Sequence, residues 1–167
     1  MIFIYIHIFL SLFISLAFRK INKSINYNSE IHLVIAGQGN INILSDSYIF
    51  EPSEVKINGE QNNLCKKTCN FTEETSNVTL YFNDIITTCE NMFYNSTNLK
   101  EIYFSNFDFS NIISTKNMFA NCTNLKKIEF GSINTSSLTN MESMFLNCSN
   151  LTSIDLSKFN TNKVETF

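Results

Sequence analysis

The amino-acid sequence predicts an α/β solenoid in which short parallel strands alternate with short helical turns, preceded by a small β-rich N-terminal cap. Two observations predict the solenoid. The dipeptide Met-Phe recurs every 26 residues, and the apolar positions that follow it recur at the same spacing. A fixed period of this length is typical of stacked repeats. A third observation predicts the cap, because residues 29–77 lack the period and contain short alternating apolar runs.

The repeat is visible at many positions. Met-Phe begins at residues 92, 118 and 144, so three units start near these positions. Apolar residues stand seven, ten and twelve positions after each Met: Leu99, Leu125 and Leu151; Ile102, Ile128 and Ile154; Phe104, Phe130 and Leu156. One unit cannot bury so many apolar side chains alone, whereas three stacked units can.

Each unit combines two periodicities. The alternation at residues 154–156 predicts a short strand with its apolar side chains directed inward. Leu138, Met141, Met144 and Cys148 are spaced by three or four residues, which predicts one face of a short helix. Successive strands would stack in parallel about 4.8 Å apart. A strand, a polar turn and a helical turn within 26 residues correspond to a leucine-rich-repeat coil.

The segment 144–161 reads Met-Phe-x-Asn-Cys-Ser-Asn-Leu-x-Ser-Ile-Asp-Leu-Ser-x-Phe-Asn-Thr. It resembles the BspA-like leucine-rich-repeat surface proteins, which share a 26-residue repeat, and the resemblance covers residues 78–167. It implies an extracellular solenoid on the cell surface, with adhesion or ligand binding as its role and no enzymatic activity.

The N-terminal segment predicts that the protein is exported from the cell. Residues 2–18 are uncharged and rich in Ile, Phe and Leu, and Arg19 and Lys20 follow them. Small residues before a cleavage point after Ala17 favour a signal peptide over residues 1–17, with residues 18–28 as a linker. An uncleaved membrane anchor and a buried helix are the alternatives. At the other end, the chain stops inside the third unit, so we expect residues 78–167 to be a truncated solenoid.

Residues 29–77 are expected to form the N-terminal cap. The runs 31–35 and 41–44 flank a turn at 37–40, which predicts a β-hairpin. Residues 54–59 predict a third strand that runs into a turn, and Pro52 lies outside any central strand.

The five cysteines suggest different roles. Cys65 and Cys69 lie close enough in sequence for a local disulfide, which an exported protein favours over free thiols. Cys122 and Cys148 occupy equivalent repeat positions and are expected as buried thiols. The chain also contains several N-x-Ser/Thr sequences, of which Asn70 and Asn77 are the candidate glycosylation sites.

Composition excludes several functions. Twelve Lys and Arg residues against fifteen Asp and Glu residues give a net charge of −3, and a single arginine is present, so no nucleic-acid partner is expected. With two histidines in the chain, we expect no catalytic site, no metal site and no cofactor. The membrane would be contacted only through an uncleaved N-terminal segment.

The candidate binding residues point outward from the predicted strands. They would line the concave face of the solenoid: Glu101, Tyr103, Lys127, Glu129, Ser153 and Asp155. The predicted function is a secreted or cell-surface module for protein–protein interaction, adhesion or ligand binding, with a protein or surface ligand as its partner. The alternatives are the ectodomain of a signalling receptor and a structural surface-coat protein.

Overall fold

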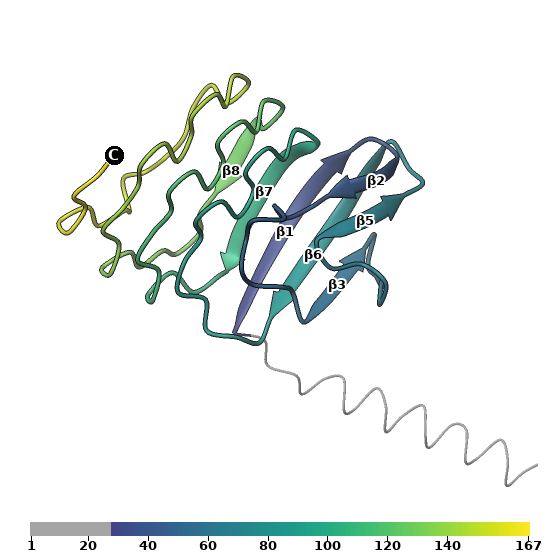
Figure 1. Cartoon of the computed structure of the whole chain (residues 1–167), viewed down its shortest axis with the longest axis horizontal. Coiled ribbons are helices and arrows are strands. Elements are labelled where there is room, and N and C mark those ends of the chain that lie inside the picture. The colour runs from purple at the N-terminus through teal and green to yellow at the C-terminus, as the bar shows by residue number, and fades with distance from the viewer. Residues whose placement is uncertain (1–27) are drawn as a thin grey trace, which may run out of the picture.

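The structure, a computed structural model, describes residues 28–167. The predicted signal peptide at residues 1–17 and almost all of the predicted linker lie outside the described residues. The described part contains eight strands (Figure 1): β1 Ser29–Ala36, β2 Gly39–Asn42, β3 Glu54–Ile57, β4 Glu60–Gln61, β5 Thr68–Phe71, β6 Thr75–Phe82, β7 Leu99–Asn106 and β8 Lys127–Glu129. Residues 28–167 contain no helix that could cross a membrane.

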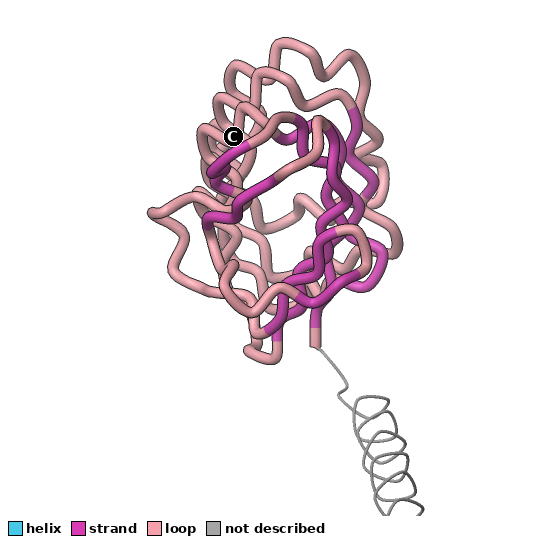
Figure 2. The backbone as a smooth tube through the Cα atoms, turned by 90° about the vertical axis from the view of Figure 1, so that its right-hand side faces the viewer, coloured by secondary structure: helices cyan, strands magenta, loops and turns pink. Residues whose placement is uncertain are grey.

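Six strands form one sheet in the order β4-β3-β6-β1-β7-β8, and β2 pairs with β5 in a separate two-stranded sheet. The β7–β8 pair is parallel and the other pairs are antiparallel. Buried side chains from both sheets belong to one continuous core. Seen from the end of the molecule, strands and turn segments surround its interior, with the large sheet on one side (Figure 2).

The prediction of an α/β solenoid made of leucine-rich-repeat coils is wrong. Residues 28–167 contain no helix, and their strands build mixed and antiparallel sheets. The segments expected as helices are chains of turns. Their apolar residues are still spaced by three or four positions, because successive turns, like a helix, bring residues at this spacing to the same side of the segment.

Left-handed residues prevent helix formation in these segments. Asn117 and Asn121 have φ values of 53° and 63°, and a right-handed helix requires negative φ throughout. Between them the backbone alternates its partners: Ala120 N–H bonds to the carbonyl of Asn117 within the turn, whereas Phe119 N–H bonds to the carbonyl of Met144. Half of the donors that a helix would use internally therefore connect neighbouring segments.

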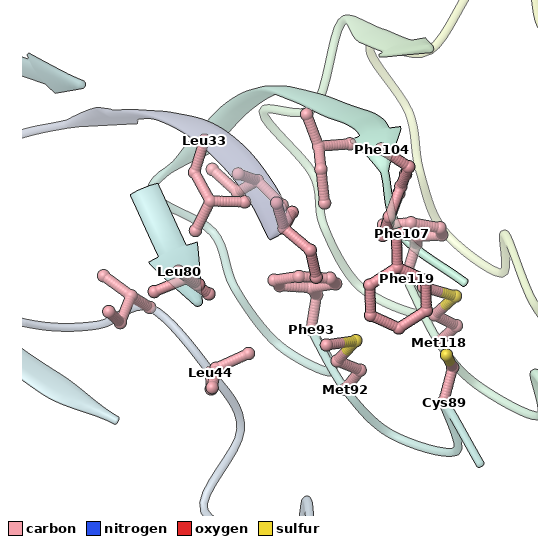
Figure 3. Packing of buried hydrophobic residues seen from close by; sticks show 14 of the residues in the cluster. Leu33, Leu44, Leu80, Cys89, Met92, Phe93, Phe104, Phe107, Met118 and Phe119 are labelled. Carbon is pink, nitrogen blue, oxygen red and sulfur yellow. The ribbon is translucent and has the colours of Figure 1, made fainter. Parts of the chain in front are cut away.

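These connections define three units, residues 88–113, 114–139 and 140–165, which we call units one, two and three. Phe93 and Phe119 occupy the same position in units one and two, and their rings stack with centroids 5.6 Å apart and planes 5° apart (Figure 3). Phe119 stacks on Phe145 of unit three in the same way, at 5.7 Å. Consecutive units therefore contact one another through equivalent residues.

The predicted hairpin in the N-terminal segment is also wrong. Strand β1 pairs with β6 on one side and β7 on the other, and β2 pairs with β5. The chain leaves the large sheet at Gly37, whose φ of +104° is accessible to glycine. Because Ala36 N–H bonds to the carbonyl of Asn98, β1 is already fixed between two partners that lie far away in sequence.

The expected strand at residues 54–57 is confirmed as β3. It pairs with β4 through a two-residue turn at Asn58 and Gly59, which have φ values of 52° and 87°. Asn-Gly with two positive φ angles is the preferred two-residue hairpin turn. Pro52 precedes the strand, as predicted.

The strand expected in unit three is missing. Ile102 of β7 pairs in parallel register with Ile128 of β8, but residues 154–156 form no strand. Leu125 and Ile128 are buried as the register predicts, whereas Leu151 and Ile154 of unit three are half-buried.

Candidate binding face

The outer face of the six-stranded sheet collects charged and aromatic side chains from five segments of the chain. The strands alternate between buried and more exposed residues, so one side of each strand faces the core and the other faces outward. We call the outward set the charged sheet face, and it comprises Glu30, His32, Glu54, Lys56, Thr79, Tyr81, Glu101, Tyr103, Lys127 and Glu129.

Four of the six sequence-predicted binding residues meet at the β7–β8 end of this face. The hydroxyl of Tyr103 donates to Oε2 of Glu101 at 2.5 Å, and Nζ of Lys127 lies 4.9 Å from the centre of the Tyr103 ring. Lys127 also forms an ion pair of 2.5 Å with Oε1 of Glu129. The hydrogen bond to Glu101 raises the pKa of Tyr103, and the bond to Glu129 raises the pKa of Lys127. The four side chains therefore form one linked cluster.

The other two predicted residues, Ser153 and Asp155, are exposed and lie outside any strand. Oδ1 of Asp155 accepts the backbone N–H of Ser157 at 2.9 Å, and hydrogen bonding from Ser157 lowers the pKa of this carboxyl. The carboxylate thus closes a local turn. It still reaches the vicinity of Glu129, because both residues line a common cavity.

Sequence reasoning missed the opposite end of the charged sheet face. Nζ of Lys56 on β3 lies 4.9 Å from the centre of the Tyr81 ring on β6 and 3.5 Å from Oε1 of Glu54. Partial burial opposes the charge of Lys56, but the attraction of Tyr81 and Glu54 outweighs it and the pKa of Lys56 is raised. Alternation in each segment indicated which residues face outward, but no sequence signal showed that β3 and β6 are neighbours.

His32 lies between the two ends of the face, on the central strand β1. Its Nε2 lies 3.0 Å from Oε1 of Glu30, and its Nδ1 lies 3.1 Å from Oγ1 of Thr79. An acid, a histidine and a hydroxyl in this order are also the components of a hydrolase triad. However, β6 is hydrogen-bonded on both sides, to β1 and to β3, so the strand around Thr79 leaves no pair of backbone donors for an oxyanion. The two contacts therefore fix the orientation of the His32 ring.

A cavity of about 240 Å³ adjoins the face between units two and three. Its lining combines apolar residues with three charged ones: Ile128, Glu129, Phe130, Gly131, Ile133, Asp155, Lys158 and Phe159. The residues equivalent to Gly131 in units one and three are Ser105 and Ser157. Gly131 has a φ of +61°, and a Cβ there would lie 3.3 Å from the carbonyl oxygen of Phe104. A side chain at this position would therefore press against the backbone of unit one.

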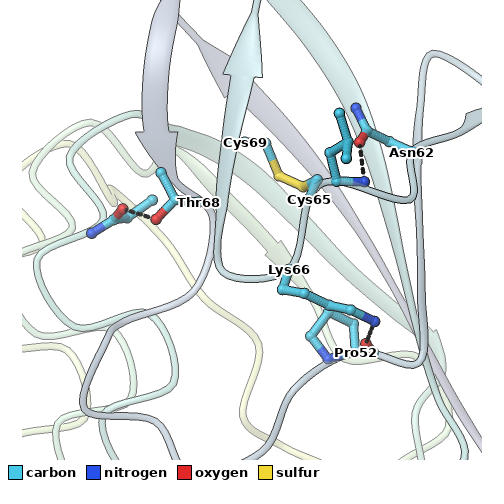
Figure 4. Close-up of a disulfide and its surroundings, with 8 residues drawn as sticks. Pro52, Asn62, Cys65, Lys66, Thr68 and Cys69 are labelled. Carbon is cyan, nitrogen blue, oxygen red and sulfur yellow. Dashed lines mark hydrogen bonds between the residues drawn. A yellow bond between two sulfur atoms is a disulfide. The ribbon is translucent and has the colours of Figure 1, made fainter.

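The predicted cysteine pair lies at the far end of the molecule. Cys65 and Cys69 form a disulfide whose loop is held by Lys66, which donates to the carbonyl of Pro52 at 2.9 Å (Figure 4). Cys122 and Cys148 are free thiols. Within residues 28–167 no group of three His, Cys, Asp or Glu side chains could hold a metal ion.

The two candidate glycosylation sites differ. The side-chain amide of Asn70 donates to Oδ1 of Asn40 at 2.9 Å across the β2–β5 pair. Asn77 is exposed on β6, and its backbone N–H bonds to Oδ1 of Asn58.

The comparisons with known proteins identify one family. A model described as "Mycoplasma protein of unknown function, DUF285" matches residues 63–167, which is more than half of the chain. The resemblance to the BspA-like leucine-rich-repeat proteins is therefore wrong as a family assignment. No curated protein and no solved structure matches the chain.

Proposed function

From the premise that this chain belongs to the DUF285 family, whose description assigns no activity, we propose that it is an exported binding module without enzymatic activity. Its charged sheet face recognises a protein or a surface ligand outside the cell. The proposal rests mainly on one observation: side chains from five separate segments of the chain are organised into a band across the sheet.

The organisation of this band supports binding. Each tyrosine, Tyr81 and Tyr103, carries a lysine above its ring, and carboxylates hold both lysines. Fixing solvated side chains in this way costs conformational entropy. Isolated surface ion pairs contribute little to the stability of the fold in return. Pre-orientation of polar side chains lowers the entropy that a binding surface must lose when a partner docks.

The charge of the band favours a basic partner. Four glutamates (Glu30, Glu54, Glu101 and Glu129) and two lysines (Lys56 and Lys127) give the face a formal charge of −4 + 2 = −2 with His32 neutral. Electrostatic complementarity between partners accelerates association and suppresses incorrect pairings. A partner surface rich in Lys or Arg therefore fits this face, and its binding should weaken as salt concentration rises.

Two features support export. The apolar N-terminal segment with small residues before Ala17 is typical of a signal peptide. The Cys65–Cys69 disulfide is typical of an oxidising compartment.

The test uses a variant of the charged sheet face and of the neighbouring Asp155. The triple substitution Tyr103→Ala, Glu129→Gln and Asp155→Asn should leave the fold intact, because all three side chains lie at the surface, and should abolish binding of the labelled protein to its native host or matrix surface. A matched control carries Tyr94→Ala, Glu90→Gln and Glu142→Gln in the turn segments. If the control loses binding and the sheet-face variant keeps it, the proposed site is wrong.

A further inference from the structure

We propose that His32 makes binding at the charged sheet face sensitive to pH, so that a basic partner is bound near neutral pH and bound less tightly in mildly acidic surroundings. The inference rests on the function proposed above, because it concerns how that same face is regulated. Three observations carry it: the place of His32 in the sheet, the two contacts of its ring, and the charges around it.

His32 occupies the centre of the charged sheet face. It lies on β1, which pairs with β6 on one side and with β7 on the other. In the register of these pairs it stands opposite Thr79 on β6 and Tyr103 on β7. Its side chain is 42% exposed, so a proton reaches the ring from solvent and a partner that covers the face must approach it.

Two neighbours determine the neutral form of the ring. Nε2 lies 3.0 Å from Oε1 of Glu30, and an ionised carboxylate only accepts, so Nε2 carries the hydrogen. Nδ1 lies 3.1 Å from Oγ1 of Thr79 and in the neutral ring accepts the hydroxyl hydrogen. When the ring is protonated, Nδ1 donates and the hydroxyl of Thr79 accepts, because a hydroxyl can do either. Protonation therefore keeps both contacts and adds one positive charge.

Titratable groups face His32 from its own strand and from both strands packed against it. They are Glu30 on β1, Tyr81 on β6, and Glu101 and Tyr103 on β7. One strand further out on each side lies an ion pair: Glu54 with Lys56 on β3, and Lys127 with Glu129 on β8. Each lysine is thus offset by a carboxylate beside it at every pH in this range. The charge of Glu30, in contrast, is offset when the His32 ring beside it is protonated.

Protonation of His32 halves the net charge of the face. The formal charge is −2 with His32 neutral and −1 with His32 protonated. In water, one unit charge about 7 Å from another changes a binding constant about threefold. Salt screens part of this effect. A partner with several basic groups over the centre of the face should therefore bind about three- to tenfold less tightly when His32 is charged.

Within residues 28–167, His32 is the group that changes charge between pH 5.5 and pH 7.5. It is the only histidine there, and histidine is the side chain that ordinarily titrates in this range. Carboxylates titrate below the range, and lysines and tyrosines titrate above it. Burial raises the pKa of each free thiol, and the two other cysteines are bonded to each other. A change in binding across this range can therefore be assigned to one residue.

The test measures how a lysine-rich peptide binds at these two pH values. The probe is a peptide in which four Lys alternate with Gly, with both ends blocked and a pH-insensitive dye attached, so its charge is constant over the range. Fluorescence anisotropy with the full chain should give a dissociation constant about three- to tenfold higher at pH 5.5 than at pH 7.5. The His32→Gln variant keeps every other titrating group, and its dissociation constant should be the same at both pH values.

The outcomes separate this inference from the function on which it rests. If the wild type binds the peptide equally at both pH values, the role of His32 is wrong and the binding face stands. The same holds if His32→Gln keeps the pH dependence of the wild type. If the wild type binds the peptide at neither pH, the basic partner proposed above is wrong, and this inference falls with it.

A second measurement uses the wild type alone, so it does not depend on the folding of a variant. NMR follows the titration of the His32 ring with and without saturating peptide. Coupling between two ligands is reciprocal, so a proton that weakens peptide binding must itself bind more weakly when the peptide is present. A tenfold effect should move the midpoint of the ring titration about one pH unit lower, and a threefold effect about half a unit. An unchanged midpoint in a protein that binds the peptide would contradict the proposal.

Discussion

The side-chain amide of Asn121 donates a hydrogen bond of 2.8 Å to the side-chain oxygen of Asn95, the residue at the same position of the preceding unit. Both residues have left-handed backbones, with φ values of 63° and 61°. Asparagine suits the position for two reasons, since it tolerates positive φ better than other side chains except glycine and its amide can both donate and accept. The contact links the backbone conformation of one unit to the side chains of the next.

Substitutions at Asn121 should separate these two contributions. Asn121→Gly keeps the left-handed backbone but removes the amide, so it should lower the free energy of unfolding by about 1–2 kcal/mol for the lost hydrogen bonds. Asn121→Ala should cost about 1 kcal/mol more, because alanine is strained at positive φ. Urea unfolding of the three proteins measures both steps, and equal stability of the two variants would show that backbone strain contributes nothing.

Phe119 should contribute far more to stability than Phe145. Phe119 is fully buried between two stacked rings, so Phe119→Ala should lower the free energy of unfolding by about 3–5 kcal/mol. Phe145 is half-buried and stacks on one side, and Phe145→Ala should cost less than half as much. Thermal or urea denaturation tests the order. A larger loss at Phe145 would mean that its outer side is covered.

Tyr103 should make stability fall at alkaline pH. Its pKa is raised in the folded protein because its hydroxyl donates to Glu101, so the protonated phenol is favoured by folding. This contribution is complete below the unfolded pKa of about 10 and is lost as pH rises through the higher folded pKa. Tyr103→Phe removes it. The stability difference between wild type and Tyr103→Phe should therefore shrink above about pH 10, and a difference that grows would contradict the assignment.

The free thiols should differ in reactivity. Burial raises the pKa of Cys122 to about 12, and it also raises the pKa of the half-buried Cys148. The thiolate is the reactive form. Under native conditions at pH 8, Cys148 should be alkylated before Cys122, and Cys89, which is fully buried, should not react until the protein unfolds. Mass spectrometry of iodoacetamide-treated protein over time gives the order, with denatured protein as the control.

Part of the candidate site could be predicted from local pattern. Alternation identified Glu101, Tyr103, Lys127 and Glu129 as outward-facing, and a period of 26 residues placed Tyr103 beside Glu129, which the parallel β7–β8 register confirms. The same reasoning extended the column to Asp155, where the strand does not form. Hydrogen bonding of the Asp155 carboxylate to Ser157 closes a turn instead, and alternation alone does not reveal that competition.

The error in fold class has a specific physical cause. Apolar residues three and four positions apart satisfy a helix, but they also satisfy consecutive turns with a left-handed residue in each. The left-handed backbones of Asn117 and Asn121 decide between these conformations. The N–H groups of Asn117, Phe119 and Asn121 bond to the next unit, and the local sequence does not show this. Intersegment hydrogen bonds therefore override the local periodicity.

The sequence by itself determined which residues repeat, which face the core, and which cysteines lie close enough to bond, because these properties depend on spacing along the chain. Only the tertiary structure decided that β1 lies between β6 and β7 and that Lys56, Tyr81 and His32 share a face with Tyr103. Strand pairing across such distances depends on which edges remain free after all segments have packed into one core. That outcome is a property of the whole chain, and no short segment encodes it.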